Sequence, residues 1–272
     1  MTQPTARSFL YAPGDRPERF DRALGCGTDA VIFDLEDGVA PDARADARAH
    51  VAAALASPTA PDDTQRWVRV NPRDAMAADL DAVLGLPGLT GVIVPKATIA
   101  SVGAALAAGA PAVGALVETA AGVLEIDALA GTRGVSHLTL GETDLAADLG
   151  IELGPDGAEL APLRLRLVVA SAAAGIAAPT APVSTAFRDL DGFRASTEAL
   201  RRAGYGSRAC IHPDQVTVVN EVLTPSPEAV AEAADLVARL EAAGGGVCLD
   251  ARGHMVDEAV ARAARRVLSR AR

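Results

Sequence analysis

Charged side chains stand at the ends of several short apolar runs in this sequence. The first clear case, AVIFDLEDG at 30–38, places three acids within four positions and then a glycine. Later runs end in an arginine, a lysine or an acid. The candidates for chemistry are Glu36, Asp37, Arg69, Lys96, Glu118 and Asp144. Any one of them could be a helix cap or a solvated loop charge, but their convergence on one rim would form a site.

Two of these acids have the chemistry of a divalent-cation site. Glu118 stands in ALVETAAG and Asp144 in LTLGETDL, each just past an apolar run. On neighbouring strand ends, the two carboxylates can share one hard cation while water and substrate oxygens take the remaining positions. The pair therefore predicts a Mg²⁺ site with Glu118 and Asp144 as ligands, and Glu118 would also border the bound substrate.

Arg69 lies inside the run RWVRVN, where a charge is costly unless it meets an anion. Its planar guanidinium suits a substrate carboxylate or a developing enolate oxygen. The alternative is an ion pair with Glu36 or Asp37, and the two roles can coexist. We expect Glu36 and Asp37 to orient Arg69 and to bind the water shell of the metal, so all three are counted as catalytic.

Lys96 is the only lysine of the chain and closes the run TGVIVPK. It could pair with the acids near residue 36 or bind an anionic substrate. A sharper alternative is a Schiff base with a carbonyl substrate, as in class I aldolases. Nearby acids would keep the ammonium charged and so a poor nucleophile, which favours the first interpretation.

Eight apolar runs rich in Val, Ile, Leu and Phe must position these residues, and longer stretches of helical spacing separate them. The pattern is typical of repeated βα units and predicts a closed (β/α)8 TIM barrel, with the site at the carboxyl ends of its strands. The run at 178–184 is the weakest, because Pro179 and Pro182 each remove a ladder donor. The runs cover 7–13, 30–37, 66–71, 90–96, 112–119, 136–142, 178–184 and 207–213.

The last 52 residues fall outside this repeat. Ser226 can cap a helix that Pro227 opens, and three glycines at 244–246 should end it. A short extended piece, VCLD, a turn and a final helix from about Asp257 follow. The sequence thus predicts two parts, a catalytic barrel at 1–220 and an appendage at 221–272.

Composition narrows the function classes. A formal net charge of −10 argues against nucleic acid or an anionic membrane as partner, since both need a clustered basic face. Three cysteines without metal-ligand spacing indicate neither a disulfide framework nor a zinc site, and they fit a reducing cytoplasm. The first residues lack the apolar run of a signal peptide, and no segment reaches the ~18 apolar residues of a membrane span. We expect a cytoplasmic protein that binds small molecules.

Eight motifs occur in an order and spacing that resemble those of a known family. They are RSFLYAPGDRPERF, VIFDLEDGV, VRVN, VPK, ALVETAAG, GETDL, CIHPDQV and GHMVDEAV, and they span nearly the whole chain. Together they resemble the citrate lyase β-subunit-like branch of the HpcH/HpaI aldolase superfamily. The resemblance implies a (β/α)8 barrel with a C-terminal helical lid, a trimer or hexamer of identical chains, and Mg²⁺-dependent cleavage or formation of carbon–carbon bonds in 3-hydroxyacyl thioesters.

Residue by residue, the resemblance implies metal binding by Glu118 and Asp144 and substrate binding by Arg69. Asp257, in GHMVD, is similar to the acid–base residue that the lid of the acyl-CoA lyases contributes to a neighbouring subunit's site. An aspartate at this point would also be an ordinary helix cap. The family often has Gly-Ala-Glu-Asp at the sixth strand, where this chain has GETD, so the role of Glu142 stays open. The seventh strand lacks the family's frequent aspartates, which leaves the acyl group open.

The leading functional hypothesis is a stand-alone lyase that converts a 3-hydroxyacyl-CoA, such as malyl-CoA or citramalyl-CoA, to acetyl-CoA and a 2-oxo acid. A citrate lyase β subunit that acts on citryl-acyl-carrier protein is the second. A pyruvate-dependent class II aldolase is the third, and the expected lid argues against it. A scaffold without activity is the fourth, and the intact set of Arg69, Glu118 and Asp144 argues against it.

Overall fold

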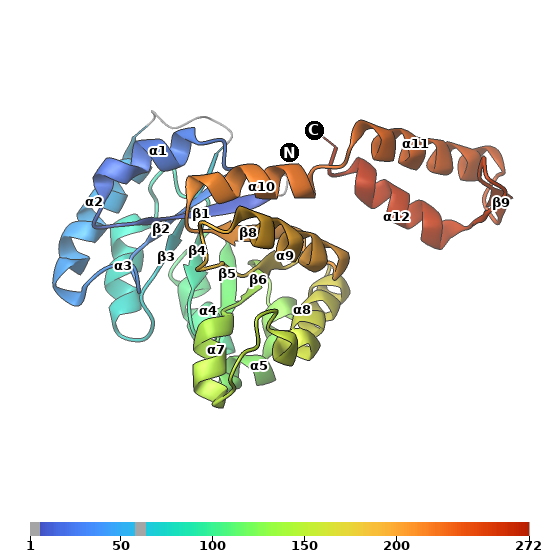
Figure 1. Ribbon diagram of the computed structural model, residues 1–272. Helices are drawn as coiled ribbons and strands as arrows, with labels where there is room; N and C mark the ends of the chain where they lie inside the picture. The colour runs from blue at the N-terminus through green and yellow to red at the C-terminus, as the bar shows by residue number, and fades with distance from the viewer. Residues whose placement is uncertain (1–5, 58–63, 272) are drawn as a thin grey trace. The chain divides into compact units, whose positions relative to one another are not determined.

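The computed structural model describes residues 6–57 and 64–271, and it contains a closed barrel of eight parallel strands (Figure 1). Each strand pairs with the next in chain order, and β8 pairs with β1. The predicted TIM barrel is confirmed, with every predicted strand present. The strands are β1 Ser8–Pro13, β2 Ala30–Asp34, β3 Gln65–Arg69, β4 Gly91–Val94, β5 Val113–Val117, β6 Val135–Leu140, β7 Thr180–Ala181 and β8 Ser207–Cys210.

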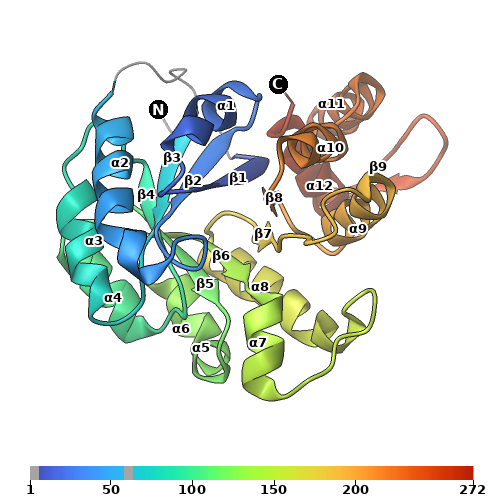
Figure 2. The same cartoon turned by 60° about the vertical axis from the view of Figure 1, so that its left-hand side comes forward.

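Helices follow the strands and surround the barrel, as Figure 2 shows. Polar side chains fix several of their starts. Thr98 and Ser101 form a reciprocal capping box at the start of α4, and Asp189 accepts from the backbone N–H of Gly192 in α9. The helices are α1 Phe20–Gly25, α2 Arg44–Ala56, α3 Ala75–Val83, α4 Ile99–Ala107, α5 Ala120–Leu124, α6 Ile126–Gly131, α7 Glu142–Leu149, α8 Ala161–Ala174, α9 Leu190–Arg202 and α10 Pro213–Leu223, and short 3₁₀ turns cover Pro17–Arg19, Pro41–Ala43 and Ala158–Leu160.

Aromatic and aliphatic side chains fill one part of the barrel interior. Phe9, Ile32 and Trp67 pack in one buried cluster there. The His137 ring lies 5.3 Å from the Phe9 ring and 5.2 Å from the indole of Trp67. Its burial lowers the pKa of His137 to about 4, so this histidine is a neutral core residue.

The seventh strand is the thinnest part of the barrel wall. It has only two residues. It pairs with β6 only between Thr180 and Thr139, and it pairs with β8 over both of its residues. Pro179 and Pro182 flank it and have no backbone N–H to donate. The hydroxyls of Thr180 and Ser207 lie 2.8 Å apart and add a side-chain link between β7 and β8. The weak seventh strand predicted from the prolines is confirmed.

The chain divides into two compact units, Met1–Asn220 and Glu221–Arg272. The second contains α11 Pro227–Ala242, a hairpin of β9 Cys248–Leu249 and β10 Met255–Val256, and α12 Glu258–Leu268. Ser226 caps α11, as the sequence predicts, and the glycines at 244–246 follow its end with positive φ. A lid role for this unit stays a prediction. In the described parts of the chain, no helix is both long and apolar enough to span a bilayer.

Candidate active site

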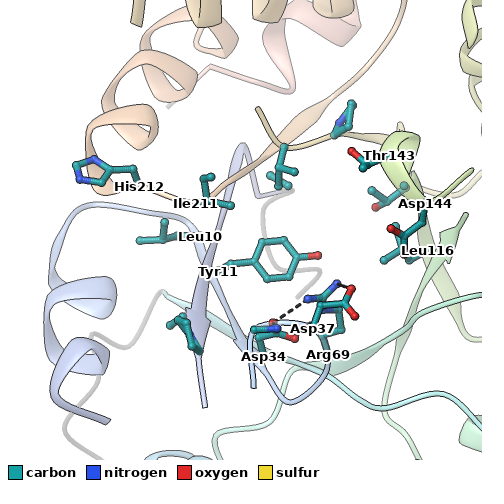
Figure 3. Close-up of a pocket in the computed structure, with 18 of the residues that line it drawn as sticks. Leu10, Tyr11, Asp34, Asp37, Arg69, Leu116, Thr143, Asp144, Ile211 and His212 are labelled. Atoms are coloured by element: carbon teal, nitrogen blue, oxygen red, sulfur yellow. Dashed lines mark hydrogen bonds and ion pairs between the residues drawn. The ribbon is translucent and has the colours of Figure 1, made fainter. Parts of the chain in front are cut away.

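A cavity of about 790 Å³ opens at the carboxyl ends of the strands (Figure 3). Charged side chains from the exits of β2, β3, β5 and β6 line one side of it. Leu10, Val183 and Ile211, from the β1, β7 and β8 segments, add apolar surface, and Arg19, Arg22 and His212 also line the cavity. The cavity therefore offers both charged and apolar surface within one space.

Arg69 is held at the floor of this cavity by a carboxylate from the neighbouring strand. Its Nε donates to Asp34 Oδ1 at 2.6 Å and its Nη2 donates to Oδ2 at 2.7 Å, which makes a bidentate pair. Figure 3 shows Arg69 facing Asp34, with a dashed line between them. Asp34 and Arg69 are paired residues in the β2–β3 register. The guanidinium also lies 5.1 Å from the centre of the Tyr11 ring. This geometry fixes the plane of the guanidinium before any ligand arrives.

Asp34 was not among the predicted site residues, and the structure explains the acid-rich turn through it. Its carboxylate accepts the backbone N–H groups of Glu36 and Gly38, at 3.0 and 2.9 Å, as well as Arg69. A side chain at Gly38 would collide with Oδ2 of Asp34, so the turn requires glycine there. Asp34 thus builds the turn that carries Glu36 and Asp37, and it orients Arg69.

Glu36 links the two cations of the site. Its Oε1 accepts from Lys96 Nζ at 2.7 Å, and its Oε2 lies 3.0 Å from Arg69 Nη1 without the alignment of a hydrogen bond. Asp37 stands further out, 3.5 Å from Arg69 Nη1 and 61% exposed. The predicted pairing of Arg69 with these acids is therefore present, but Asp34 is its principal partner.

Lys96 is charged in this environment. Burial lowers the pKa of its ammonium, but the hydrogen bond to Glu36 and the charges of Glu118 and Glu36 outweigh burial and raise the pKa above its usual range. A protonated amine cannot attack a carbonyl. The contacts of Lys96 therefore argue against the Schiff-base alternative and agree with its pairing with the acids.

Glu118 is buried at the end of β5 and lacks a close cation of its own. Lys96 Nζ lies 3.5 Å from Oε1, and the backbone N–H of Lys96 donates to the same oxygen at 2.9 Å. Burial, followed by the negative charge of Glu36, raises the pKa of Glu118 to about 7. Gly141 leaves room for Glu118 Oε2, since a Cβ there would lie 2.5 Å away.

Glu118 and Asp144 fit a divalent cation by charge and by donor type. Asp144 Oδ2 lies 3.6 Å from the same Lys96 Nζ, so both carboxylates face one space. Carboxylates outnumber the cations here, since five of them lie within 4 Å of Arg69 or Lys96: Asp34, Glu36, Asp37, Glu118 and Asp144. Within the described residues, no three His, Cys, Asp or Glu side chains gather in metal-binding geometry. A Mg²⁺ ion here would therefore use two carboxylates and complete its shell with water and substrate oxygens.

Glu142 is engaged elsewhere. Its two oxygens accept from Arg164 Nε at 2.6 Å and Arg164 Nη2 at 2.7 Å, and Arg164 Nη1 donates to the carbonyl of Asp156 at 3.1 Å. The pair ties the start of α7 to α8 and to the loop between them. Sequence reasoning missed Arg164, because an arginine in a helix two elements away carries no local signal. The geometry indicates that Glu142 is a structural acid in the cavity wall.

We predict that Glu142→Ala lowers stability and leaves metal binding unchanged. Removal of one partner from a largely buried pair costs about 3 kcal/mol, which should lower the Tm by roughly 5 °C or more. Differential scanning calorimetry and Mg²⁺ titration calorimetry measure the two effects. A Mg²⁺ dissociation constant raised tenfold would instead make Glu142 part of the metal site.

Asp257 lies in the second unit and caps α12. Its Oδ1 accepts from the backbone N–H groups of Ala259 at 2.9 Å and Val260 at 3.0 Å. The capping expected of an aspartate here is present. The acid–base role that the resemblance assigns to Asp257 stays a prediction.

The fold and the site define a (β/α)8-barrel protein whose strand ends carry an oriented arginine beside paired acids. The chain belongs to the HpcH/HpaI aldolase/citrate lyase family, whose model matches residues 7–213. Membership places it among the carbon–carbon lyases, and the resemblance seen in the motifs is confirmed.

Relatives and solved structures agree with this membership. The chain is 34% identical to a (3S)-malyl-CoA thioesterase of Cereibacter sphaeroides, over 87% of this chain and 84% of the relative. It is 31% identical to an L-malyl-CoA/beta-methylmalyl-CoA lyase of the same species, over 87% and 85%. The crystal structure of protein CitE from Mycobacterium tuberculosis in complex with magnesium, acetoacetate and coenzyme A matches with a TM-score of 0.83, 31% identity and 99% coverage of both chains.

Proposed function

We propose that this chain is a Mg²⁺-dependent lyase that cleaves a 3-hydroxyacyl-CoA, of the malyl-CoA or citramalyl-CoA type, to acetyl-CoA and a 2-oxo acid. The observation that carries the proposal is that the carboxylates of Glu118 and Asp144 both face the space beside Lys96. They line the same cavity as Arg69, which Asp34 holds in a fixed orientation. The lyase relative and the CitE complex with magnesium and coenzyme A support it.

The residues divide the work of a reverse aldol reaction. Bound Mg²⁺ would polarise the hydroxyl and carboxylate oxygens that become the 2-oxo acid. A base removes the hydroxyl proton, the carbon–carbon bond breaks, and its electrons pass to the thioester as an enolate. Arg69 donates N–H groups to the oxyanion, and a carboxyl group of Asp257 returns a proton to the enolate carbon. Glu36 and Asp37 keep Arg69 oriented, and Lys96 can meet the substrate carboxylate.

A product assay tests this function. Malyl-CoA and citramalyl-CoA are each incubated with the protein in Mg²⁺ or in excess EDTA, and products are separated by chromatography. We expect glyoxylate or pyruvate together with acetyl-CoA, only when Mg²⁺ is present. Condensation of acetyl-CoA with either oxo acid should run in the same conditions. If the same products form in excess EDTA, the reaction does not require the metal.

Thioester hydrolysis is a second candidate, because a relative of comparable coverage is a (3S)-malyl-CoA thioesterase. Hydrolysis needs a water at the thioester carbonyl and leaves the malyl carbon chain intact. The same assay separates the two candidates: a thioesterase gives malate and free coenzyme A, and a lyase gives glyoxylate and acetyl-CoA. A citrate lyase β subunit would instead require an acyl-carrier protein thioester. A cytoplasmic location stays a prediction.

We predict that Asp257→Asn lowers turnover by about 10², the scale of one general acid or base. Asparagine caps helices as well as aspartate does, and its amide oxygen would still accept from the backbone N–H groups of Ala259 and Val260. The Tm should therefore stay within about 2 °C. Steady-state kinetics and calorimetry make the measurement, and normal turnover of the variant would exclude Asp257 from the chemistry.

We also propose that Asp257 serves the site of a neighbouring copy in a homotrimer or homohexamer. Asp257→Asn chains mixed with Glu118→Ala chains should then exceed the activity of either variant alone, because some sites combine an intact barrel of one chain with an intact Asp257 of another. Sedimentation must first establish that mixed oligomers form. Mixed oligomers without recovered activity would show that each chain uses its own Asp257.

A further inference from the structure

Lys96 adopts a backbone conformation that side chains rarely take. Its φ is 47°, and within the described residues only Arg73 shares a positive φ without being glycine. Such a conformation persists when its surroundings hold it in place. Here the backbone N–H of Lys96 donates to Glu118 Oε1 at 2.9 Å and the ammonium donates to Glu36 Oε1 at 2.7 Å. The residue is therefore fixed at both ends by acids of the site.

The ammonium stands where it must interact with any metal bound at this site. It lies 3.5 Å from Glu118 Oε1 and 3.6 Å from Asp144 Oδ2, the two carboxylates proposed as ligands. A cation bound to these oxygens would lie within a few ångströms of Nζ. Glu36 and Glu118 are only 2% and 3% exposed, whereas the side chains of Lys96 and Asp144 are 34% and 43% exposed, so solvent reduces the repulsion between the two cations without removing it.

We infer that Lys96 is a positioning residue whose ammonium acts as a built-in counter-ion of the metal ligands. In the metal-free protein it holds together Glu36 after β2, Glu118 after β5 and Asp144 in α7. When a divalent cation binds, the same charge opposes it, so the free protein binds Mg²⁺ more weakly than its carboxylates alone would. The inference rests on the proposed metal site.

The counter-ion role and an ordinary structural role predict opposite changes in metal affinity. If Lys96 only supported the fold of the site, its replacement would disturb Glu118 and weaken Mg²⁺ binding. If its charge opposes the metal, a neutral residue of similar length strengthens binding. The backbone N–H that holds Glu118 remains in the variant, since it belongs to the main chain.

The test is Mg²⁺ titration calorimetry of Lys96→Met at pH 8, which is above the pKa of about 7 of Glu118. We expect the dissociation constant to fall at least tenfold relative to wild type, equivalent to about 1.4 kcal/mol. In EDTA the variant should melt several degrees lower than wild type, because Glu36 loses the one cation that donates a hydrogen bond to it and keeps only Arg69 nearby. Excess Mg²⁺ should reduce the difference in melting temperature between the variant and wild type.

Arg73→Met is the matched control. Arg73 carries the same charge on an exposed strand-exit loop, and its φ of 58° places a methionine in the same strained region. Its Mg²⁺ dissociation constant should stay within about twofold of wild type. Lys96→Gln is a second variant that keeps an N–H donor for Glu36, and it should also bind more tightly than wild type.

Each outcome decides the inference. Unchanged or weaker Mg²⁺ binding in folded Lys96→Met and Lys96→Gln, with normal binding in wild type, overturns the counter-ion role and leaves the proposed function standing. Equal tightening in Arg73→Met would show a general charge effect and also overturn it. If none of the proteins, wild type included, gives a heat of Mg²⁺ binding, the inference is wrong and the proposed function cannot depend on Mg²⁺.

Discussion

Glu118→Ala and Asp144→Ala should each abolish metal-dependent turnover, with a loss of about 10³ or more, while the barrel stays folded. Each change removes one of only two protein ligands from the proposed ion, and two carboxylates are already a small set for Mg²⁺. Glu118 also carries a buried charge, and its pKa is raised to about 7, mainly by burial. Its removal relieves an unfavourable buried charge and also removes the acceptor of the Lys96 backbone N–H, so we expect the barrel to stay folded.

Mg²⁺ titration calorimetry and product formation measure this effect together. The matched control is Glu152→Gln, an exposed acid in the loop after α7. It should bind Mg²⁺ and turn over as wild type does. Full activity of Glu118→Ala or Asp144→Ala, or full activity of wild type in excess EDTA, would rule out the proposed metal site.

Arg69→Lys should lower kcat by about 10² to 10³, the scale expected when one oxyanion donor is lost. Lysine keeps the charge but cannot make two parallel hydrogen bonds to Asp34 while it also faces Glu36 and the cavity. The donor groups therefore lose their fixed direction in the transition state. Steady-state kinetics separate this role from simple binding: a variant that changes only KM would show that Arg69 merely holds substrate.

Arg66→Lys is the control on the same strand. Arg66 Nη1 donates to the carbonyls of Ala54 and Ser57, which belong to α2 and to the residue that follows it. Its replacement should lower stability and leave kcat unchanged. If both variants lose kcat to the same extent, the effect belongs to β3 as a whole and not to the guanidinium of Arg69.

The elements of the barrel could be predicted because each rests on a local pattern. Buried strands such as β2 and β5 are continuous apolar runs, and proline alone identified the weak β7. The site residues could be grouped because strand ends of a parallel barrel meet at one rim. Ser226 and the glycines at 244–246 marked α11 by the chemistry of helix ends.

The partners within the site were harder to predict. Asp34 looked like part of a strand, yet it is the principal partner of Arg69; the signal was that both are the last residues of adjacent paired strands. Arg164 comes from α8, and only the tertiary fold brings it to Glu142. Register and helix packing decide such pairs, and neither can be read from residue types along one segment.

The charge state of Lys96 also protects the protein from its own proposed substrate. Thioesters acylate neutral amines readily, and a free lysine amine beside a bound acyl-CoA would accept the acyl group as a stable amide. Glu36 and Glu118 hold the one lysine of the chain as an ammonium, which has no electron pair to offer. Apart from Lys96, the Lys and Arg residues of the chain are all arginines, whose guanidinium groups resist acylation at neutral pH. Side-chain amines of this chain are thereby kept out of irreversible self-acylation.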